Sequence, residues 1–266
     1  MARTSSLALA QLDHRPWPQP ASPWVMAQSW HDLLFAHWPI SPDLLRPLVP
    51  SILELDTFDG MGWIGVVPFR MSGVRPRGLP AVPWLSAFPE LNVRTYVRHP
   101  SPPHRPGVYF FSLDAANPVA VAIARAVFHL PYFRAEMSIT AQGEDVVYRS
   151  TRTHGGVPVG QFTGVYGPSG PVYAAQPGTL DHWLTERYCL YATSPFHSRP
   201  QSQTGPWDLW RSEIHHAPWP LQPAHAQIDT NTVAQSLGVP LADTPPLLHF
   251  ARRIDVVVWP PKRLKG

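Results

Sequence analysis

The sequence predicts an α+β protein built on a mostly antiparallel, closed β-barrel with a few short peripheral helices. Proline makes up 34 of the 266 residues. Each proline removes a backbone donor and fixes φ near roughly −65°, which disfavours long helices and a wide, helix-covered parallel sheet. Aromatic residues make up 11% of the chain, so the chain has a large core to bury and is not disordered by composition. Apolar runs of strand length recur between turn residues, which is typical of many short strands.

Composition also excludes several classes of protein. The formal net charge of the chain is only +3, and the Arg residues are scattered along the sequence rather than clustered. We therefore expect no nucleic-acid partner. Cys189 is the single cysteine, which excludes an internal disulfide and a multi-thiolate metal site. No apolar run approaches the length of about 18 residues that spans a membrane, and the apolar run 7–10 is shorter than a signal peptide requires. We therefore expect a cytoplasmic protein with no membrane association.

The chain shows one composition regime after its first residues. Residues 1–22 are rich in Ser, Pro and Gln, and we expect them to form a flexible N-terminal segment. No internal repeat is present in the remainder. We therefore expect one domain over 23–266.

The first half of the chain reads mainly as strands. Ser41 and Pro42 suit the N-cap and first position of a short helix over 41–49. A loop rich in Pro and Gly follows over 72–83. The expected strands are 30–38, 52–60, 63–71, 88–99 and 107–115.

The second half begins with the clearest helix, over 117–131. Asn117 can cap it, Pro118 can open it and Pro131 can stop it. Further helices are expected over 179–191, running into an extended segment, and near 225–237. The expected strands are 133–141, 145–153, 157–166, 210–219 and 247–259.

Three of these strands carry polar side chains on one face. Side chains alternate between the two faces of a strand, so each set shares a side. The sets are Glu90, Asn92 and Arg94; Arg211, Glu213 and His215; and His249, Arg253 and Asp255. They are either solvated faces of antiparallel sheets or the lining of a barrel interior that holds a ligand, and their spacing does not decide between the two.

Familiar catalytic and metal-binding motifs do not appear. His215 and His216 are adjacent, so in a regular strand they point to opposite faces and cannot chelate one ion. No GxSxG elbow or Gly-rich phosphate loop is present, and Cys189 between Tyr188 and Leu190 reads as a small buried hydrophobe. We therefore expect no metal and no cofactor.

Several strings in one order resemble a known family. They are WHDLLFAHWPI (30–40), FPELNVRTYV (88–97), GVYFFSLDA (107–115), IARAVFHLPYFRAEM (123–137), LTERYCLY (184–191), EIHHAPWPLQPA (213–224) and LLHFARRIDVVVWP (247–260). The chain resembles the YqjF-like family, whose domain has no known function, over residues 23–262. That family is placed with the acetoacetate decarboxylase-like superfamily, so the resemblance implies a cone-like β-barrel around a small-molecule cavity.

The chain departs from the decarboxylase in its chemistry. The decarboxylase uses a lysine that forms a Schiff base, whereas the matching stretch here, 130–134, contains Arg134 and no Lys, and the chain has no Lys before Lys262. Arginine stays protonated and cannot form the imine. The resemblance places the superfamily's pocket glutamate at Glu90 and turns its face inward.

These observations leave three hypotheses. The first is an acid–base enzyme on a small carboxylate or carbonyl compound; the second is a non-catalytic binder or sensor with the same cavity. The third is an interaction protein that uses Trp207–Trp210 and Ala217–Pro220, and a homo-oligomer is left open. The catalytic candidates are Glu90 and His215, and the ligand-binding candidates are Asn92, Arg94, Tyr132, Arg134, Glu136, Arg211 and Glu213.

Overall fold

The computed structural model describes residue 9 and residues 11–194 and 208–264. Its helical elements are short: α2 (Pro42–Leu45), η1 (Arg46–Leu48), α3 (Pro118–Val127), α4 (Leu180–Thr185) and η2 (Gln235–Leu237). Its strands are β1 (Met26–Ile40), β2 (Glu54–Leu55), β3 (Gly62–Pro76), β4 (Phe88–Arg98), β5 (Gly107–Ala115), β6 (Tyr132–Gln142), β7 (Asp145–Arg152), β8 (Gln161–Pro168), β9 (Cys189–Ser194), β10 (Asp208–His215), β11 (Leu221–Asn231), β12 (Leu247–Val258) and β13 (Lys262–Leu264). Among the helices in this part of the chain, none is long and apolar enough to cross a membrane.

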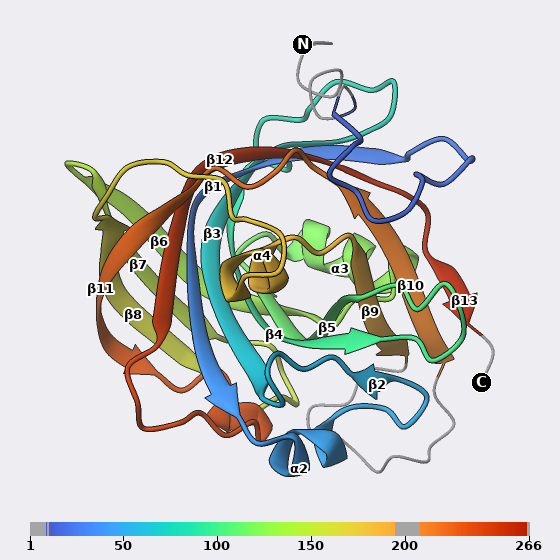
Figure 1. Cartoon of the computed structure of the whole chain (residues 1–266). Coiled ribbons are helices and arrows are strands. Elements are labelled where there is room, and N and C mark those ends of the chain that lie inside the picture. Colours follow the sequence, from blue (N-terminus) through green and yellow to red (C-terminus); the bar gives the residue numbers. More distant parts are fainter. Residues whose placement is uncertain (1–8, 10, 195–207, 265–266) are drawn as a thin grey trace.

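The strands form one sheet, and two additional strand pairings close it into two rings that share five strands. Its order is β13-β10-β9-β5-β6-β7-β8-β11-β12-β1-β3-β4-β2, with further pairings of β10 with β12 and of β5 with β4. The run β12-β1-β3-β4-β5 is therefore a shared wall. On one side β9 and β10 bridge the two ends of this wall and complete a ring, and on the other side β6, β7, β8 and β11 complete a second ring (Figure 1). Only β5–β6 and β5–β9 are parallel pairs, so the mostly antiparallel closed barrel predicted from the sequence is confirmed.

The shared wall separates two cores. Leu91 and Val93 of β4 belong to a cluster with Tyr148 of β7 and Phe162 of β8. The opposite face of the wall belongs to a second cluster, which lies inside the ring closed by β9 and β10 and includes residues of β1, β3, β5 and β10. Because both faces of the wall are buried, both alternating sets of side chains on β4 are interior.

Capping explains where the helices begin, and proline explains how far they run. Ser41 accepts a hydrogen bond from the backbone N–H of Asp43, and Asn117 accepts from the backbone N–H groups of Val119 and Ala120, as predicted. The helix expected over 117–131 ends earlier, at Val127. Pro131 disfavours the α conformation of the residue before it, and His129 already has a positive φ of 53°.

Three element predictions were wrong, wholly or in part. The segment 225–237 is mostly strand β11, with only the turn η2 at its end. Ala224, Ala226 and Ile228 alternate with polar residues and pack against the first core, and this period of two suits a strand that pairs with β8. The alternating run 52–60 forms only the two-residue strand β2, and part of the expected loop 72–83 extends β3 to Pro76.

The N-terminal segment is anchored where the structure describes it. The Arg15 side chain is 1% exposed and donates to Glu213 Oε2 at 2.8 Å and to the Ile214 carbonyl at 2.6 Å. Trp17 Nε1 donates to the same Glu213 oxygen at 3.0 Å. These contacts form because the polar outer face of β10 supplies a buried carboxylate that needs a cation. The flexibility expected of segment 1–22 stays a prediction. Residues 1–8 and 10 lie outside the described residues.

A buried ion pair fixes the second ring to the shared wall. Arg152 Nε donates to Asp114 Oδ1 at 2.8 Å, with both side chains fully buried, and Arg152 Nη2 donates to Ser112 at 3.0 Å. Desolvation raises the pKa of Asp114, while Arg152 acts to lower it. Each charge offsets the cost of burying the other, because a single buried charge on β5 or on β7 would destabilise the fold.

We expect Arg152→Met to lower the free energy of unfolding by roughly 3–5 kcal/mol, because it leaves Asp114 buried without its cation. The double variant Asp114→Asn, Arg152→Met should recover part of this loss. Urea unfolding followed by Trp fluorescence measures both. Strictly additive losses in the double-mutant cycle would contradict the coupling of the two charges.

Candidate functional site

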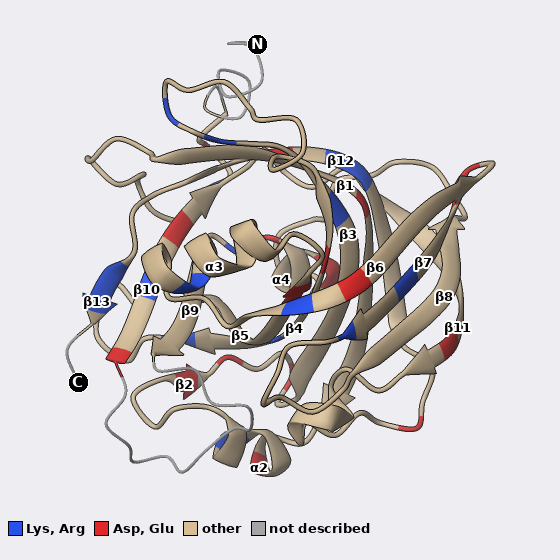
Figure 2. Ribbon diagram, turned by 180° about the vertical axis from the view of Figure 1, so that it is seen from behind, with Lys and Arg blue, Asp and Glu red and all other residues tan. Residues whose placement is uncertain are grey.

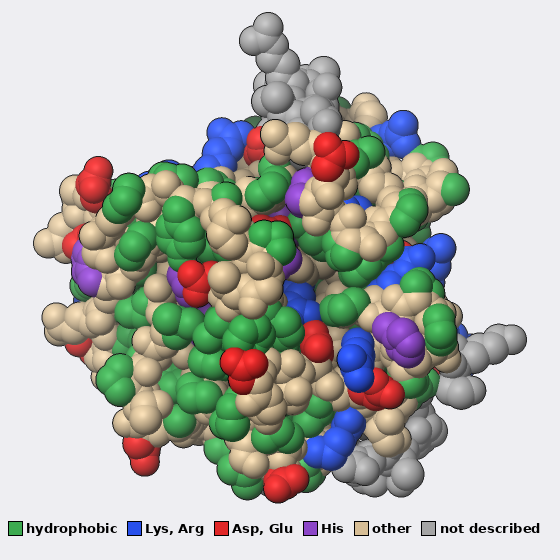
Figure 3. Space-filling model, in the orientation of Figure 1, with side chains coloured by type: hydrophobic (Ala, Val, Ile, Leu, Met, Phe, Trp, Pro, Cys, Tyr) green, Lys and Arg blue, Asp and Glu red, His purple; other side chains and the backbone are tan. Residues whose placement is uncertain are grey.

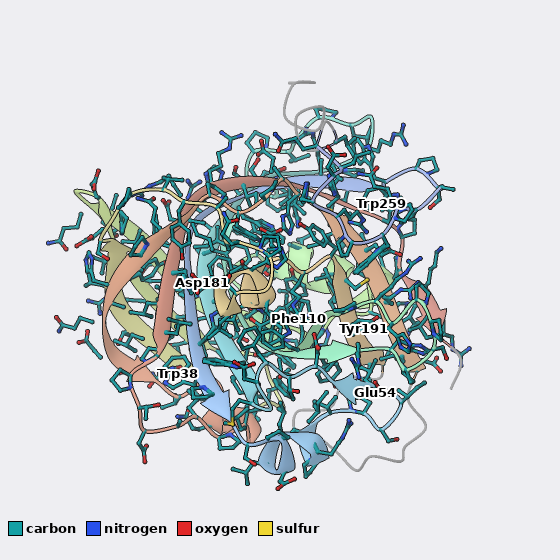
Figure 4. All side chains as sticks on the ribbon, viewed as in Figure 1. Trp38, Glu54, Phe110, Asp181, Tyr191 and Trp259 are labelled. Carbon is teal, nitrogen blue, oxygen red and sulfur yellow. The ribbon has the colours of Figure 1, made fainter. Side chains whose placement is uncertain are left out.

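A cavity of about 70 Å³ lies inside the ring closed by β9 and β10. Its walls come from all five strands of the shared wall and from β6, β9 and β10. The chain between α3 and β6 and the residues at and after the end of α4 complete them. Phe110, labelled in Figure 4, is one of its aromatic walls and lies in the interior of the ring near α4. The volume is about half that of an engineered cavity of roughly 150 Å³ that binds benzene, so the cavity suits a small polar group.

The polar face of β4 lines this cavity. Glu90, Asn92 and Arg94 all contribute to its wall, as alternation along a strand requires. The backbone positions of Glu90 and Arg94 are about 13 Å apart along β4, at 3.3 Å per residue. The two residues therefore lie toward opposite ends of the cavity. Phe88 and Met71, which are register partners, lie beyond Glu90, whereas Arg94 lies beside His37 and Tyr96 and acts on the pKa values of both.

Glu90 is a buried carboxyl group without a matching cation. Tyr132 Oη donates to Glu90 Oε2 at 2.6 Å, and Tyr148 Oη donates to the Glu90 backbone carbonyl at 2.7 Å. Burial raises the pKa of Glu90 to about 8, opposed by the Tyr132 hydrogen bond and aided by the nearby Asp114. Glu90 therefore holds a proton at neutral pH and can donate it or take it back close to that pH.

Arg94 supplies positive charge at the other end of the cavity. None of the ion pairs among the described residues includes Arg94, and its guanidinium lies 5.4 Å from the centroid of the Phe35 ring. Arg187 reaches the same end but is paired with Asp56 at 2.5 Å. With Glu90 neutral, the cavity carries the charge of Arg94, which suits an anion such as a carboxylate.

Other polar atoms around the cavity also lack partners within the protein. Six lining residues each carry a buried side-chain nitrogen or oxygen with no hydrogen-bond partner among the described residues. These atoms are Gln28 Oε1, Trp30 Nε1, Asn92 Oδ1, Arg94 Nε, Arg187 Nη2 and Trp219 Nε1. Buried polar groups are nearly always hydrogen-bonded, so such a concentration around one cavity indicates that a polar ligand or water completes the site.

The predicted residues on β6 divide between the inside and the outside. Tyr132 lines the cavity, whereas Arg134 and Glu136 are exposed on the outer side of β6. Strand alternation from Tyr132 would turn both of them inward, but the parallel pairing of β6 with β5 ends at Arg134. Beyond that point β6 leaves the ring and follows β7 into the second ring.

The predicted set on β10 points away from the cavity. Glu213 is bonded to Arg15, Trp17 and Arg105, and Arg211 lies 3.8 Å from the same carboxylate. His215 Nε2 donates to the Gln11 carbonyl at 3.1 Å. The physical reason is that the N-terminal segment covers this polar face of β10, so its polarity does not mark the ring interior.

The opposite face of β10 lines the cavity, with Ser212, Ile214 and His216. His216 is buried, desolvation lowers its pKa, and its Nδ1 donates to the Ala217 carbonyl at 2.8 Å. The sequence argument that the two adjacent histidines face opposite sides holds, but it selected the outer one. No sequence signal distinguished the faces, because both carry polar residues.

The third predicted set serves the framework, whereas Trp219 of the predicted segment Ala217–Pro220 lines the cavity. His249 Nε2 lies 3.0 Å from Asp181, and Arg253 pairs with Asp255 at the surface. Trp219 is buried and stacks on Trp30 with ring centroids 6.0 Å apart. Trp207 lies outside the described residues.

Lysine chemistry finds no support among the lining residues. Lys262, the first lysine of the chain, is exposed on β13 and pairs in register with Arg211. None of the described residues that line the cavity is a lysine.

The surface seen in Figure 3 intersperses acidic and basic side chains rather than gathering one sign.

Comparison with known proteins agrees with this architecture. The model of a family described as an uncharacterized conserved protein, DUF2071, matches residues 27–255. The "Uncharacterized protein YqjF" of Bacillus subtilis is 45% identical over 237 residues, which cover 89% of this chain and 91% of that protein.

Solved structures share the fold at low identity. Acetoacetate decarboxylase from Legionella pneumophila has a TM-score of 0.59 at 13% identity, with 95% of this chain and 93% of that chain covered. An acetoacetate decarboxylase-like enzyme from Sphingomonas wittichii has a TM-score of 0.57 at 14% identity, with 97% and 100% covered. The enduracididine biosynthesis enzyme MppR, complexed with pyruvate, has a TM-score of 0.59 at 12% identity, with 95% and 93% covered. At these identities the likeness shows the fold alone.

The raised pKa of Glu90 predicts a pH-dependent stability. Between its ordinary value of 4.5 and about 8, the folded protein retains a proton that the unfolded chain has released. Rising pH therefore favours unfolding in this window, by up to about 1.4 kcal/mol per pH unit. Glu90→Gln removes this dependence, so we expect the variant to match the native protein near pH 5 and to exceed its melting temperature near pH 8.

Thermal unfolding at a series of pH values tests this, with Glu136→Gln as the matched control on the exposed part of β6. A Glu90→Gln curve that stays parallel to that of the native protein from pH 5 to pH 8 would show that Glu90 is ionised in the fold.

Proposed function

The chain belongs to the DUF2071 family of uncharacterized conserved proteins, and from this premise we propose that it is an acid–base enzyme of the lyase or isomerase type. Its substrate is a small carboxylate or carbonyl compound, and its chemistry uses no Schiff-base lysine. The observation that carries the proposal is the buried, proton-holding Glu90, bonded to Tyr132 at 2.6 Å on the wall of a cavity whose charge comes from Arg94.

The proposed roles follow from the positions of the groups. Arg94 holds the substrate carboxylate, because a guanidinium matches two carboxylate oxygens at once. Protonated Glu90 gives its proton to the carbonyl oxygen or to a carbon of the substrate, and its ionised form takes a proton from a carbon beside the carbonyl. A pKa of about 8 keeps both forms accessible near neutral pH, which favours general acid–base catalysis. Tyr132 stabilises the ionised form through its hydrogen bond.

His215 does not enter this mechanism. It was a candidate second proton carrier, but it lies on the outer face of β10 against Gln11. Its neighbour His216 lines the cavity and is held neutral by burial, so a second histidine contribution falls to His216 as a neutral hydrogen-bonding group.

A second candidate function is a non-catalytic binder or sensor of the same ligand class. It is favoured by the cavity, by its unpartnered polar atoms and by the absence of a lysine among the described lining residues. Such a protein needs Arg94 and Asn92 for recognition but no turnover. It would return its ligand chemically unchanged.

We expect a thermal-shift screen of keto acids, hydroxy acids, enolisable ketones and aromatic carboxylates to yield ligands that depend on Arg94. A ligand at a hundred times its Kd stabilises the fold by about 2.7 kcal/mol, or several degrees at roughly 2–4 °C per kcal/mol. Arg94→Met should lose the shift, and Arg134→Met, an arginine on the exposed part of β6, should keep it. A shift retained in Arg94→Met would move the ligand away from this cavity.

Turnover then separates the two functions. Incubation of each ligand with the native protein, followed by mass and NMR spectra, shows whether it is converted. For the enzyme we expect Glu90→Gln to lower kcat by about 10²–10⁴-fold while Glu136→Gln leaves it unchanged. A ligand recovered intact would establish the binder, and a turnover unaffected by Glu90→Gln would remove Glu90 from the chemistry.

A further inference from the structure

A second hollow, of about 440 Å³, lies between α3 and the barrel. Figure 2 shows α3 crossing the opening of the ring on the side away from α4. The hollow is lined almost entirely by apolar side chains from α3, from the start of β1, from the end of β3 and from the chain after β12. We call this hollow the vestibule. Its α3 side includes Ala120, Ala124 and Val127.

The vestibule adjoins the cavity lined by Glu90, Asn92 and Arg94, which we call the polar cavity after these side chains. Six residues belong to the walls of both: Met26, Gln28, Met71, Phe128, Leu130 and Tyr132. The junction therefore lies at Tyr132, the residue that donates to Glu90. An object that enters through the vestibule meets apolar surface first, then the Glu90–Tyr132 pair, and the Arg94 charge last.

This order matches the parts of an amphipathic acid. A carboxylate at Arg94 places the following carbons along β4 toward Glu90, since the two residues share one strand face. The polar cavity, at about 70 Å³, has room for little more than such a head group, whereas the vestibule is about six times larger and apolar. Among the described residues that line the two hollows, the vestibule offers the apolar surface that a chain attached to the head group would need.

We propose that the substrate is an amphipathic carboxylate, an oxo or hydroxy acid whose apolar chain occupies the vestibule while its head group occupies the polar cavity. This inference rests on the proposed function and deepens it by naming the substrate class. The vestibule selects for chain length, and Tyr132 marks the boundary between the chain and the reacting carbons.

The exposed apolar side chains near this entrance fit the same picture. Ile123 and Val127 of α3 are 45% and 53% exposed and line the vestibule. A docked protein would cover such a surface from outside, but it would leave unexplained why the hollow shares six lining residues with a cavity that contains a charged group. These shared residues therefore favour a small molecule.

A chain-length series of straight-chain 2-oxo acids, from three to ten carbons, tests the inference by calorimetric Kd measurements. For the native protein we expect affinity to rise about fourfold per methylene once the chain enters the vestibule, the fold-change that corresponds to about 0.8 kcal/mol per buried CH₂. Ala124→Phe fills the vestibule and should abolish the gain for the longer acids while leaving the three-carbon acid unchanged. Ala122→Phe is the matched control, because Ala122 is an exposed alanine of the same helix outside the vestibule lining.

The outcomes are separable. Binding of the short acid with no gain over the series would overturn the vestibule inference and leave the proposed function standing. Long-chain binding that survives in Ala124→Phe as in Ala122→Phe, or that survives Arg94→Met, would place the chain or the head group elsewhere and overturn the inference. Failure of every acid to bind would overturn the proposed function itself.

Discussion

The burial of the shared wall β12-β1-β3-β4-β5 on both faces is the constraint on which the rest of the structure depends. In an ordinary antiparallel sheet one face of each strand meets water, and a polar face needs no further explanation. Here β4 has a core on either side, so Glu90, Asn92 and Arg94 have no route to solvent except through a cavity. Their polarity costs stability unless a partner satisfies it, and the cavity is the space that the proposed ligand would occupy.

The buried carboxyl groups of Asp114 and Glu90 have different kinds of partner. Asp114 of β5 faces Arg152 at 2.8 Å, and that guanidinium is also held by Ser112. Glu90, whose strand neighbour Leu91 is the register partner of Asp114, has a tyrosine instead of a cation. The first arrangement neutralises a charge and fixes the fold. The second prevents the charge from forming at neutral pH and leaves a transferable proton at the edge of a cavity, which is the arrangement that acid–base chemistry uses.

The sequence could predict the barrel and the residues of β4 that share a face, because proline content and strand alternation are local signals. That this face of β4 points inward was expected only from the family resemblance. The sequence could not choose between the faces of β10. Arg211, Glu213 and His215 are as polar as any cavity lining, and only the docking of Arg15 and Trp17 from almost 200 residues away shows that this face is satisfied by the chain itself. Arg134 and Glu136 failed for a related reason, since the point where β6 leaves the ring is set by pairing with β7. Alternation thus predicts which residues share a face of a strand, whereas tertiary docking and strand pairing determine whether that face lines the cavity.

The absence of a lysine among the described lining residues and the order of groups along the cavity bear together on the proposed function. A lysine nucleophile fixes a ketone covalently, so it can position a very small substrate without further contacts. A site that works by proton transfer alone must hold its substrate by non-covalent contacts on both sides of the reacting atoms, because misplacement removes the benefit of a matched pKa. Arg94 offers one such contact at the closed end, and the apolar vestibule beyond Tyr132 offers the other. Glu90 stands between the two contacts, at the position where a held substrate would meet it.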